Sequence, residues 1–380
     1  MRKGWEYKKL GEVCCPKSKI QRATKCFGGS DEILYIDISS IDNSVQEVNS
    51  ITSFTMSNAP SRAQQKVEYG DIIVSTVRPN LKNVAFIKQH DSNLVASSGF
   101  CVLRTTDDIE RNYLFRYITS DIFTQHLMKL TTGANYPAVR DLDVRDSTIP
   151  LPPKSTQLAI VSELDKINEL IRLKKEQLKD FDNLAQSLFY EMFGDPVENE
   201  KGWEVKKLVE VSSLINGRAY KQNELLNEGK YKVLRVGNFF TNSNYYYSNL
   251  ELDDEKYCYK GDLLFAWSAS FGAFIWDEGK TIFHYHIWRV LFDEKNLNIY
   301  YYKYLLNTMT NFFMNDVHGI GMVHLTKAGM EQYNLPLPPL PLQHLFAQRI
   351  EQIEHQKAEV QKAITDLEPL LASRMQYWFE

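Results

Sequence analysis

The chain has 380 residues, of which 43% are hydrophobic and 24% charged, and its formal net charge is −4. This composition is typical of a folded globular protein of two or three domains and excludes a disordered, collagen-like or disulfide-stapled chain. No apolar run approaches the ~20 residues of a membrane span, and no apolar signal segment follows the basic N-terminus, so we expect a cytoplasmic protein. The five cysteines form no CxxC pair and predict reduced thiols.

The two halves of the sequence repeat each other. GWEYKKLGEVC at 4–14 returns as GWEVKKLVEVS at 202–212, with eight of eleven positions identical. Further along, GDIIVST from Gly70 matches GDLLFAW from Gly261. Because the same motifs recur in the same order, the sequence predicts an internal duplication.

Each half begins with a region of mixed secondary structure. Short runs rich in β-branched and aromatic residues predict strands, namely ILYIDIS, GDIIVSTV and GFCVLR in the first copy and YKVLRVG, GDLLFAW and HIWRVLF in the second. RNYLFRYITSDIFTQHLMKL and NIYYYKYLLNTMTNFFMND predict helices after them. We therefore expect the α+β class, with globular domains over 1–150 and 195–337.

A long helix is predicted at the end of each half, over 151–194 and 338–380. A proline-rich lead, IPLPPKSTQ or LPLPPLPLQ, precedes an apolar pattern with a heptad period over about four heptads, which is typical of a coiled-coil seam. If the helices pair antiparallel, they separate the two domains as a spacer. The predicted seam residues are Leu164, Ile167, Ile171, Leu178, Phe181, Leu188, Ile350, Ile353, Val360, Ile364, Leu367 and Leu371.

Two charged residues interrupt the seam of the second helix. Lys357 and Arg374 occupy heptad positions that are otherwise apolar, and the pattern does not say what they face. The alternative is that both stretches are ordinary core helices, but their length and their shared register favour a coiled coil.

The sequence lacks the common catalytic signatures. It contains no GxxxxGK[ST], GxGxxG, HExxH or GxSxG motif and no Asn/Asp-Pro-Pro-aromatic tetrapeptide. The densest polar cluster is FHYH at 283–286. On a strand, His284 and His286 would share one face and could hold a metal with Asp262, but the first copy has ASSG at 96–99 instead. Structural histidines and a contact with a base or phosphate are the other interpretations, and we expect neither a catalytic nor a metal site.

Several turns carry side chains that can donate to phosphate or reach base edges. They lie after each GDII or GDLL strand, near each domain's end, and in an early loop of each copy. Equivalent loops with different side chains on similar frames predict readers of two different sequences, although surface loops are polar and variable in any protein. The candidate DNA-binding residues are Arg22, Lys25, Arg78, Asn80, Lys82, Asn135, Arg140, Arg218, Lys221, Ser268, Ser270, His286, His318 and His324.

Three motifs recur in the same order in both halves: the GW-x-x-KKL-x-EV start, the GDII or GDLL strand, and the PLPP-x-x-x-Q lead into a long helix. Together they resemble the specificity subunit of Type I restriction–modification systems over essentially the whole chain. The resemblance implies a non-catalytic subunit with two target recognition domains, each reading half of a bipartite sequence in double-stranded DNA. It also implies helices that set the gap between half-sites and dock two methyltransferase subunits and, through them, restriction subunits. S-adenosylmethionine, ATP and Mg would then bind those partner subunits and not this chain.

Three other interpretations stay open from the sequence. The chain could be the specificity subunit of a system that only methylates, a scaffold without DNA preference, or a metal-assisted hydrolase built on the histidine pair. The near-neutral charge does not separate them, because any DNA-binding surface must come from the local arrangement of charge.

Overall fold

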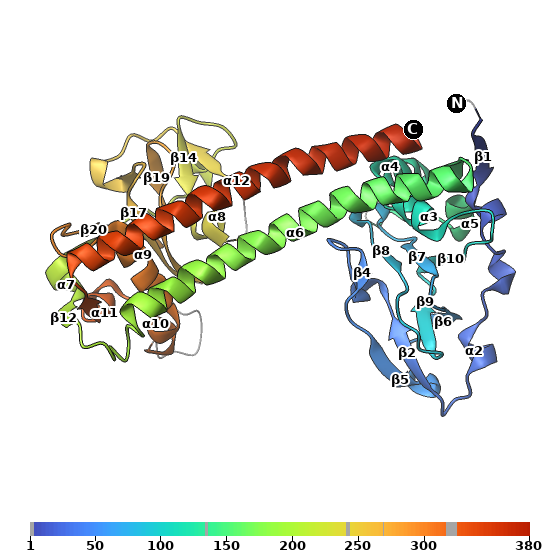
Figure 1. Ribbon diagram of the computed structural model, residues 1–380, viewed down its shortest axis with the longest axis horizontal. Coiled ribbons are helices and arrows are strands. Elements are labelled where there is room, and N and C mark those ends of the chain that lie inside the picture. The colour runs from blue at the N-terminus through green and yellow to red at the C-terminus, as the bar shows by residue number, and fades with distance from the viewer. Residues whose placement is uncertain (1–3, 134–135, 241–243, 269, 317–324) are drawn as a thin grey trace. The chain divides into compact units, whose positions relative to one another are not determined.

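The computed structural model describes residues 4–133, 136–240, 244–268, 270–316 and 325–380 (Figure 1). The chain divides into two compact units, Met1–Lys175 with Lys362–Glu380 (unit 1) and Glu176–Gln361 (unit 2). This division passes through both long helices, so each unit contains one mixed α/β region and half of each helix. Among the described residues, no helix is both long enough and apolar enough to cross a bilayer.

The elements of unit 1 run in chain order as β1 (Glu6–Lys9), α1 (Leu10–Val13), α2 (Ala23–Cys26), β2 (Glu32–Ile36), β3 (Ile41–Asp42), β4 (Glu47–Val48), β5 (Thr52–Thr55), β6 (Ala63–Lys66), β7 (Ile72–Ser75), β8 (Val84–Phe86), β9 (Leu94–Ser97), β10 (Phe100–Leu103), α3 (Arg111–Ile118), α4 (Asp121–Leu130), α5 (Asp141–Arg145), β11 (Thr148–Leu151) and the start of α6 (Lys154–Phe193). Short 3-10 turns, such as Pro79–Leu81, connect some of them.

After the end of α6, unit 2 continues as β12 (Glu204–Lys207), α7 (Leu208–Val211), β13 (Ser212–Asn216), β14 (Tyr231–Leu234), α8 (Val236–Phe240), β15 (Tyr246–Ser248), β16 (Tyr257–Cys258), β17 (Leu263–Ser268), β18 (Ser270–Ile275), β19 (Thr281–Phe283), β20 (Ile287–Phe292), α9 (Ile299–Thr308), α10 (Thr310–Asp316), α11 (Lys327–Met330), β21 (Asn334–Leu337) and the start of α12 (Leu340–Phe379). The last turns of α12 belong to unit 1.

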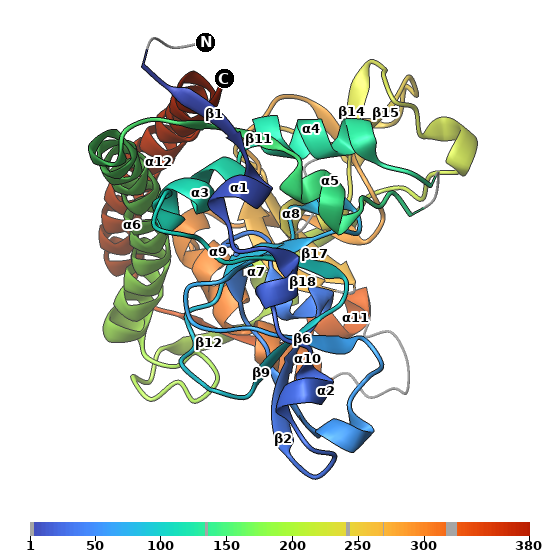
Figure 2. The same cartoon turned by 90° about the vertical axis from the view of Figure 1, so that its right-hand side faces the viewer.

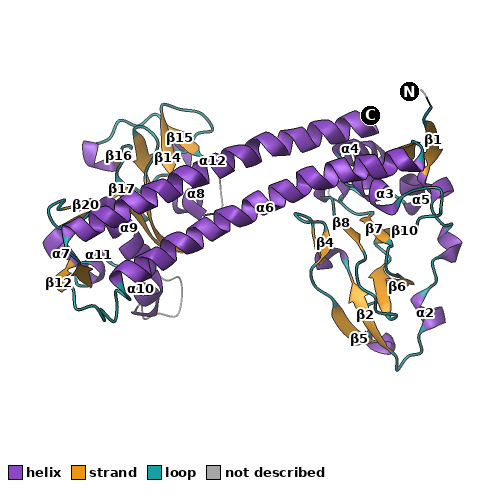
Figure 3. Ribbon diagram, in the orientation of Figure 1, coloured by secondary structure: helices purple, strands orange, loops and turns teal. Residues whose placement is uncertain are grey.

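The sheets of the two units have matching topology (Figure 3). Unit 1 has the order β5-β2-β9-β6 with β2 and β9 parallel, and unit 2 has β15-β14-β19-β16 with β14 and β19 parallel. An antiparallel sheet β10-β7-β8 in unit 1 corresponds to β20-β17-β18 in unit 2, which β13 extends at its edge. The predicted α+β class and the duplication are therefore confirmed in the fold.

The proline-rich leads form strands that close each domain. β1 pairs with β11 and β12 pairs with β21 in the same antiparallel register, Glu6 opposite Leu151 and Glu204 opposite Leu337. A buried tyrosine on α3 or α9, which precede β11 and β21 in the chain, satisfies a proline carbonyl in each copy. Tyr113 and Tyr301 each donate a 2.8 Å hydrogen bond from the hydroxyl to the carbonyl oxygen of Pro150 or Pro336.

The glutamine that ends each PLPP-x-x-x-Q motif is buried, and its side chain both accepts and donates hydrogen bonds. Gln157 accepts from the backbone N–H of Glu110 (2.8 Å) and donates to the carbonyl of Pro152 (2.8 Å). Gln343 accepts from the N–H of Asn298 (2.8 Å) and donates to the carbonyl of Pro338 (2.8 Å). In each unit this side chain joins the start of a long helix to the residue that caps α3 or α9, which explains the motif's last position.

Within each unit, α6 and α12 lie side by side and run in opposite directions (Figure 2). In unit 1, Glu163 pairs with Arg374 and the later Lys175 pairs with the earlier Glu368. In unit 2, Asp182 pairs with Lys357, and further along α6 the ring of Phe189 lies 5.8 Å from that of Phe346. The antiparallel pairing is thus confirmed, and every predicted seam residue is buried or half-buried.

The two charges in the seam face acidic residues of α6. The Lys357 Nζ lies 2.7 Å from a carboxylate oxygen of Asp182 and 3.4 Å from one of Glu354. Arg374 forms a two-pronged ion pair with Glu163, which also accepts a hydrogen bond from the Trp378 indole. Each charge is compensated where it interrupts the apolar stripe, so the seam tolerates it.

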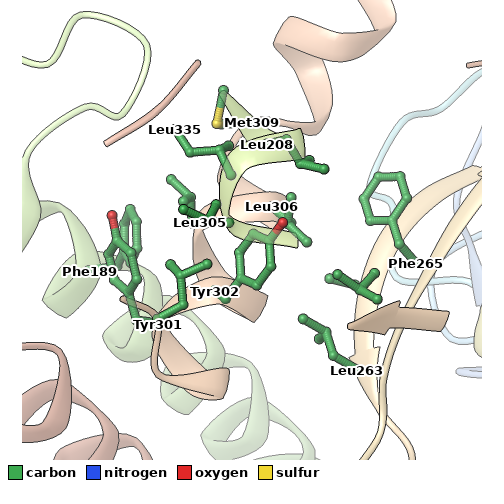
Figure 4. Close-up of a cluster of buried hydrophobic side chains, with 14 of the residues drawn as sticks. Phe189, Leu208, Leu263, Phe265, Tyr301, Tyr302, Leu305, Leu306, Met309 and Leu335 are labelled. Atoms are coloured by element: carbon green, nitrogen blue, oxygen red, sulfur yellow. The ribbon is translucent and has the colours of Figure 1, made fainter. Parts of the chain in front are cut away.

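The end of each long helix contributes to a hydrophobic core. In unit 2, Phe189 of α6 packs beside Tyr301 of α9, whose neighbours in the core include Leu305 of the same helix (Figure 4). Phe193, the last residue of α6, lies 4.7 Å from Tyr301 between ring centres. In unit 1, Phe379, the last residue of α12, takes the equivalent place 5.3 Å from Tyr113.

We predict that Gln343→Ala lowers the stability of the chain by about 1–3 kcal/mol, because the half-buried N–H of Asn298 and two carbonyl groups lose the buried side chain that bonds them. Urea unfolding monitored by circular dichroism measures the change. Gln348→Ala, at an exposed position of the same helix, is the matched control. Equal unfolding midpoints for the two variants would contradict the structural role of Gln343.

Candidate nucleic-acid interface

Three loops meet in unit 1 through backbone hydrogen bonds. The N–H of Thr76, after β7, donates to the carbonyl of Gly99 in the β9–β10 turn (2.9 Å). The carbonyl of Thr76 accepts from Val139 (2.9 Å), and the N–H of Arg78 donates to Pro137 (2.7 Å), both in the loop before α5. We call this meeting point the loop junction of unit 1. It brings together the two candidate loops near residues 78–83 and 131–140.

Unit 2 contains the same loop junction. The N–H of Trp267 donates to the carbonyl of His286 (3.1 Å), and the carbonyl of Trp267 accepts from Leu325 (3.3 Å). These bonds occupy the places of the Thr76 bonds in unit 1. The frame is therefore duplicated while the side chains on it differ.

Some of the candidate side chains at the loop junction of unit 1 already form ion pairs within the chain. Arg78 has a left-handed backbone (φ 48°) and its exposed guanidinium lies 4.6 Å from the centre of the Tyr136 ring. Asn80 is exposed. Lys82 forms an ion pair with Asp121 (2.6 Å), and Arg140 forms one with Asp143 (2.6 Å). Arg78 and Asn80 are thus the candidates here that keep their polar groups for a ligand.

Arg22 and Lys25 line one hollow of about 550 Å³, together with Lys17. The amide side chains of Gln64 and Gln65 add to its lining, as does Ser98 from the β9–β10 turn, which extends the hollow to the loop junction. Neither Arg22 nor Lys25 forms an ion pair with another described residue. We call this feature the basic hollow. Lys17 pairs with Asp141 (3.4 Å) and the Gln65 amide donates to the carbonyls of Ser97 and Phe100, so Arg22 and Lys25 are the lining cations that best suit phosphate oxygens.

The early loop of unit 2 differs in its charge. Arg218 donates two hydrogen bonds to Glu224 (2.9 and 2.8 Å), and these bonds hold the pKa of that carboxyl at about 2. Lys221 is exposed, and its N–H also donates to Glu224 (2.8 Å). The positive charge of Arg218 is therefore compensated inside the loop, unlike that of Arg22.

We expected a loop directly after the GDLL strand, and this expectation is wrong. β17 and β18 pair antiparallel as far as Ser268 opposite Ser270, so both candidate serines lie on strands. The Ser268 side chain is buried and is not offered to a ligand, whereas Ser270 is half-buried.

The histidine pair lies between two strands and not within one, so the expectation that His284 and His286 share the face of a strand is corrected. β19 ends at Phe283 and β20 begins at Ile287, and His284 and His286 lie between them with ring centres 4.9 Å apart. Burial lowers the pKa of His284 to about 4, helped by the positive charges of His286 and Arg235. His284 is therefore neutral near pH 7.

A metal site is not assembled around this pair. Within the part of the chain that the structure describes, no three His, Cys, Asp or Glu side chains gather as ligands. Asp262 instead accepts a 2.8 Å hydrogen bond from the N–H of Tyr259.

The candidates Asn135, His318 and His324 lie outside the described residues.

Sequence reasoning missed three residues that the structure places at the loop junctions. Tyr136 and Tyr285 are exposed aromatic residues within the segments 131–140 and 283–286. A large aromatic ring in a polar turn is the sequence feature that could have indicated them. Arg235 is exposed beside His284, directly after β14, where the first copy has Asp37 after β2. Aligning the two copies residue by residue would have revealed this exchange of charge.

Comparison with known proteins agrees with the duplicated frame. A family model described as the Type I restriction modification DNA specificity domain matches residues 2–180 and again 200–368. The MjaIX specificity subunit of a Type I restriction enzyme from Methanocaldococcus jannaschii is 24% identical over 324 residues, which cover 78% of this chain and 74% of the relative.

Solved structures show the same fold. A chain from a structure on complex assembly and conformational transition of the type I R-M system is 27% identical, with a TM-score of 0.66 over 100% of this chain and 98% of that one. The Type-I restriction–modification S subunit from M. genitalium is 13% identical, with a TM-score of 0.54 over 99% and 96% of the two chains, and supports the fold alone.

We predict that the stability of the chain falls as the pH drops from about 6.5 to about 4. The pKa of His284 is about 4 in the folded chain and about 6.5 when unfolded, so the unfolded state binds more protons in this window. His284→Gln should flatten the pH dependence measured by urea unfolding, whereas His355→Gln, at an exposed position of α12, should keep it. Parallel pH profiles for His284→Gln and the wild type would contradict the burial argument.

Proposed function

The chain belongs to the family of the Type I restriction modification DNA specificity domain, and from this premise we propose that its two units read the two halves of a bipartite target in double-stranded DNA. The observation that carries the proposal is the loop junction, which is built twice on the same backbone bonds with different side chains. A duplicated frame supports similar docking on DNA, and different side chains support different sequences.

In this proposal, contacts with phosphate and contacts with base edges come from different, neighbouring sets of side chains in each unit. In unit 1, the cations of the basic hollow suit phosphate oxygens, which position the domain, and Arg78 and Asn80 suit base edges. A bidentate contact with the correct base contributes about 1–3 kcal/mol of discrimination. With a net charge of −4, the chain relies on partner subunits for much of the sequence-independent attraction to DNA.

Catalysis belongs to the partner subunits in this proposal. The sequence carries no common catalytic motif, and we assign no catalytic residue to this chain. Methyltransferase subunits would bind S-adenosylmethionine and methylate the target adenine after flipping it out of the duplex, which requires no reactive group here. Restriction subunits, where present, would supply ATP- and Mg-dependent cleavage.

The long helices serve two roles in the proposal, namely setting the gap between half-sites and docking two methyltransferase subunits. α6 exposes leucines at positions other than those of its seam, Leu170 and Leu173 in unit 1 and Leu184 in unit 2. α12 likewise exposes Leu345 and Leu370. These exposed apolar side chains do not take part in the seam between α6 and α12. At helical spacing, they support contacts with helices of another subunit.

A map of methylated adenines tests the proposal. In cells that express the chain with its methyltransferase, we expect methylation at a split motif of two short blocks around a constant gap, and its loss when the chain is deleted. Exchanging 1–150 for the same region of a relative should change one block only. An unchanged map after deletion would contradict the proposal, and methylation without cleavage would indicate a system that only methylates.

Lengthening both helices tests the spacer role. Inserting one heptad between Lys175 and Glu176 and another between Gln361 and Lys362 keeps the seam in register and adds about 10 Å, or about three base pairs. We expect both blocks to keep their bases while the gap lengthens.

The matched control inserts the heptad in α6 alone, which shifts the seam out of register and should abolish methylation. If the paired insertion changed the bases of a block and left the gap unchanged, the helices would not set the spacing.

A further inference from the structure

We propose that Tyr285, at the tip of the turn between β19 and β20, contacts the methyl group of a thymine in the major groove and so determines one base of the half-site read by unit 2. The inference rests on the proposed function, because it names the base contact made at that same loop junction.

The backbone of Tyr285 is held on both sides. The carbonyl of His284 accepts from the N–H of Ile287 (3.0 Å), which closes the turn around Tyr285. The N–H of Tyr285 donates to the carbonyl of Arg218 (3.1 Å), and its carbonyl accepts from the Trp267 indole N–H (3.0 Å). Both backbone groups of a turn residue are thus engaged, and the position of its side chain is determined by the fold.

The ring of Tyr285 is packed and yet exposed. Its centre lies 3.9 Å from that of His286, 4.7 Å from that of His284 and 5.9 Å from that of Trp267. Nevertheless, 39% of Tyr285 remains exposed. An aromatic ring that is already immobilised loses little conformational entropy when it contacts a ligand, which is the property of an efficient contact residue.

The equivalent place in unit 1 carries a different chemistry. Ser98 directly precedes Gly99 and Tyr285 directly precedes His286, and the carbonyls of Gly99 and His286 accept the matching bonds from the N–H groups of Thr76 and Trp267. The Ser98 side chain lines the basic hollow beside Arg22. The two units therefore present a hydroxyl group and an aromatic ring at the same point of the frame, which suits different base edges.

Thymine is the base that matches an aromatic ring in the major groove. Each base edge there presents hydrogen-bond donors or acceptors, but only thymine adds an apolar methyl group. Arg235, exposed beside the turn, supplies positive charge for the neighbouring phosphates. The ring thus reads the base while the cation positions it.

The test uses the complex of the full chain with its methyltransferase and duplexes that carry the motif. Each thymine of the unit 2 half-site is replaced in turn by uracil, which lacks only the methyl group. We expect one replacement to weaken binding by the wild type about fourfold, as for the loss of one buried methyl group. Tyr285→Ser should bind the thymine and uracil duplexes equally, and Tyr285→Phe should keep the preference.

Tyr190→Ser provides the matched control, because Tyr190 lies in the same unit on α6 and is also 39% exposed. This variant should keep the preference for thymine. Equal binding of all wild-type duplexes, or a preference that persists in Tyr285→Ser, would overturn the assignment of Tyr285 while selective binding of the motif upholds the proposed function. Binding without any preference for the motif would overturn both.

Discussion

The structure depends on one exchange between the two copies: each long helix begins after one domain and ends in the core of the other. Phe193 at the end of α6 is buried beside Tyr301 of unit 2, and Phe379 at the end of α12 is buried beside Tyr113 of unit 1. Burying a phenylalanine contributes about 1.5–3 kcal/mol. Neither helix can leave its partner without exposing core residues of a unit, so the antiparallel pair is part of the fold of both domains.

The duplication conserves backbone bonds and leaves the exposed side chains free to differ. Thr76 and Trp267 form the same backbone bonds at the loop junctions, and the buried side chains of Gln157 and Gln343 form matching bonds to backbone groups at the starts of the helices. Backbone groups are identical in every residue, so a turn keeps its shape when its side chains change. If the two units read different half-sites, as proposed, the chain benefits from keeping the backbone frame constant while the exposed side chains change.

Charge is distributed differently between the two early loops. In unit 1, Arg22 and Lys25 face the basic hollow without a carboxylate in its lining, whereas in unit 2 Glu224 compensates Arg218. The proposed reader of unit 2 accordingly relies more on the aromatic turn around Tyr285, and that of unit 1 more on cations and amides. This difference in loop charge fits a DNA target whose two half-sites differ in base composition.

Much of the architecture follows from short-range patterns, since repeated motifs and a heptad period are visible in the order of residues. These patterns predicted the duplication, the α+β domains and the two long helices. The state of individual side chains did not follow, because it depends on residues far away in the chain. Asp121 engages Lys82, the hairpin buries Ser268, and the end of β19 places the histidine pair between two strands. Exposure and pairing are three-dimensional properties, and they decide which loop residues remain available to DNA.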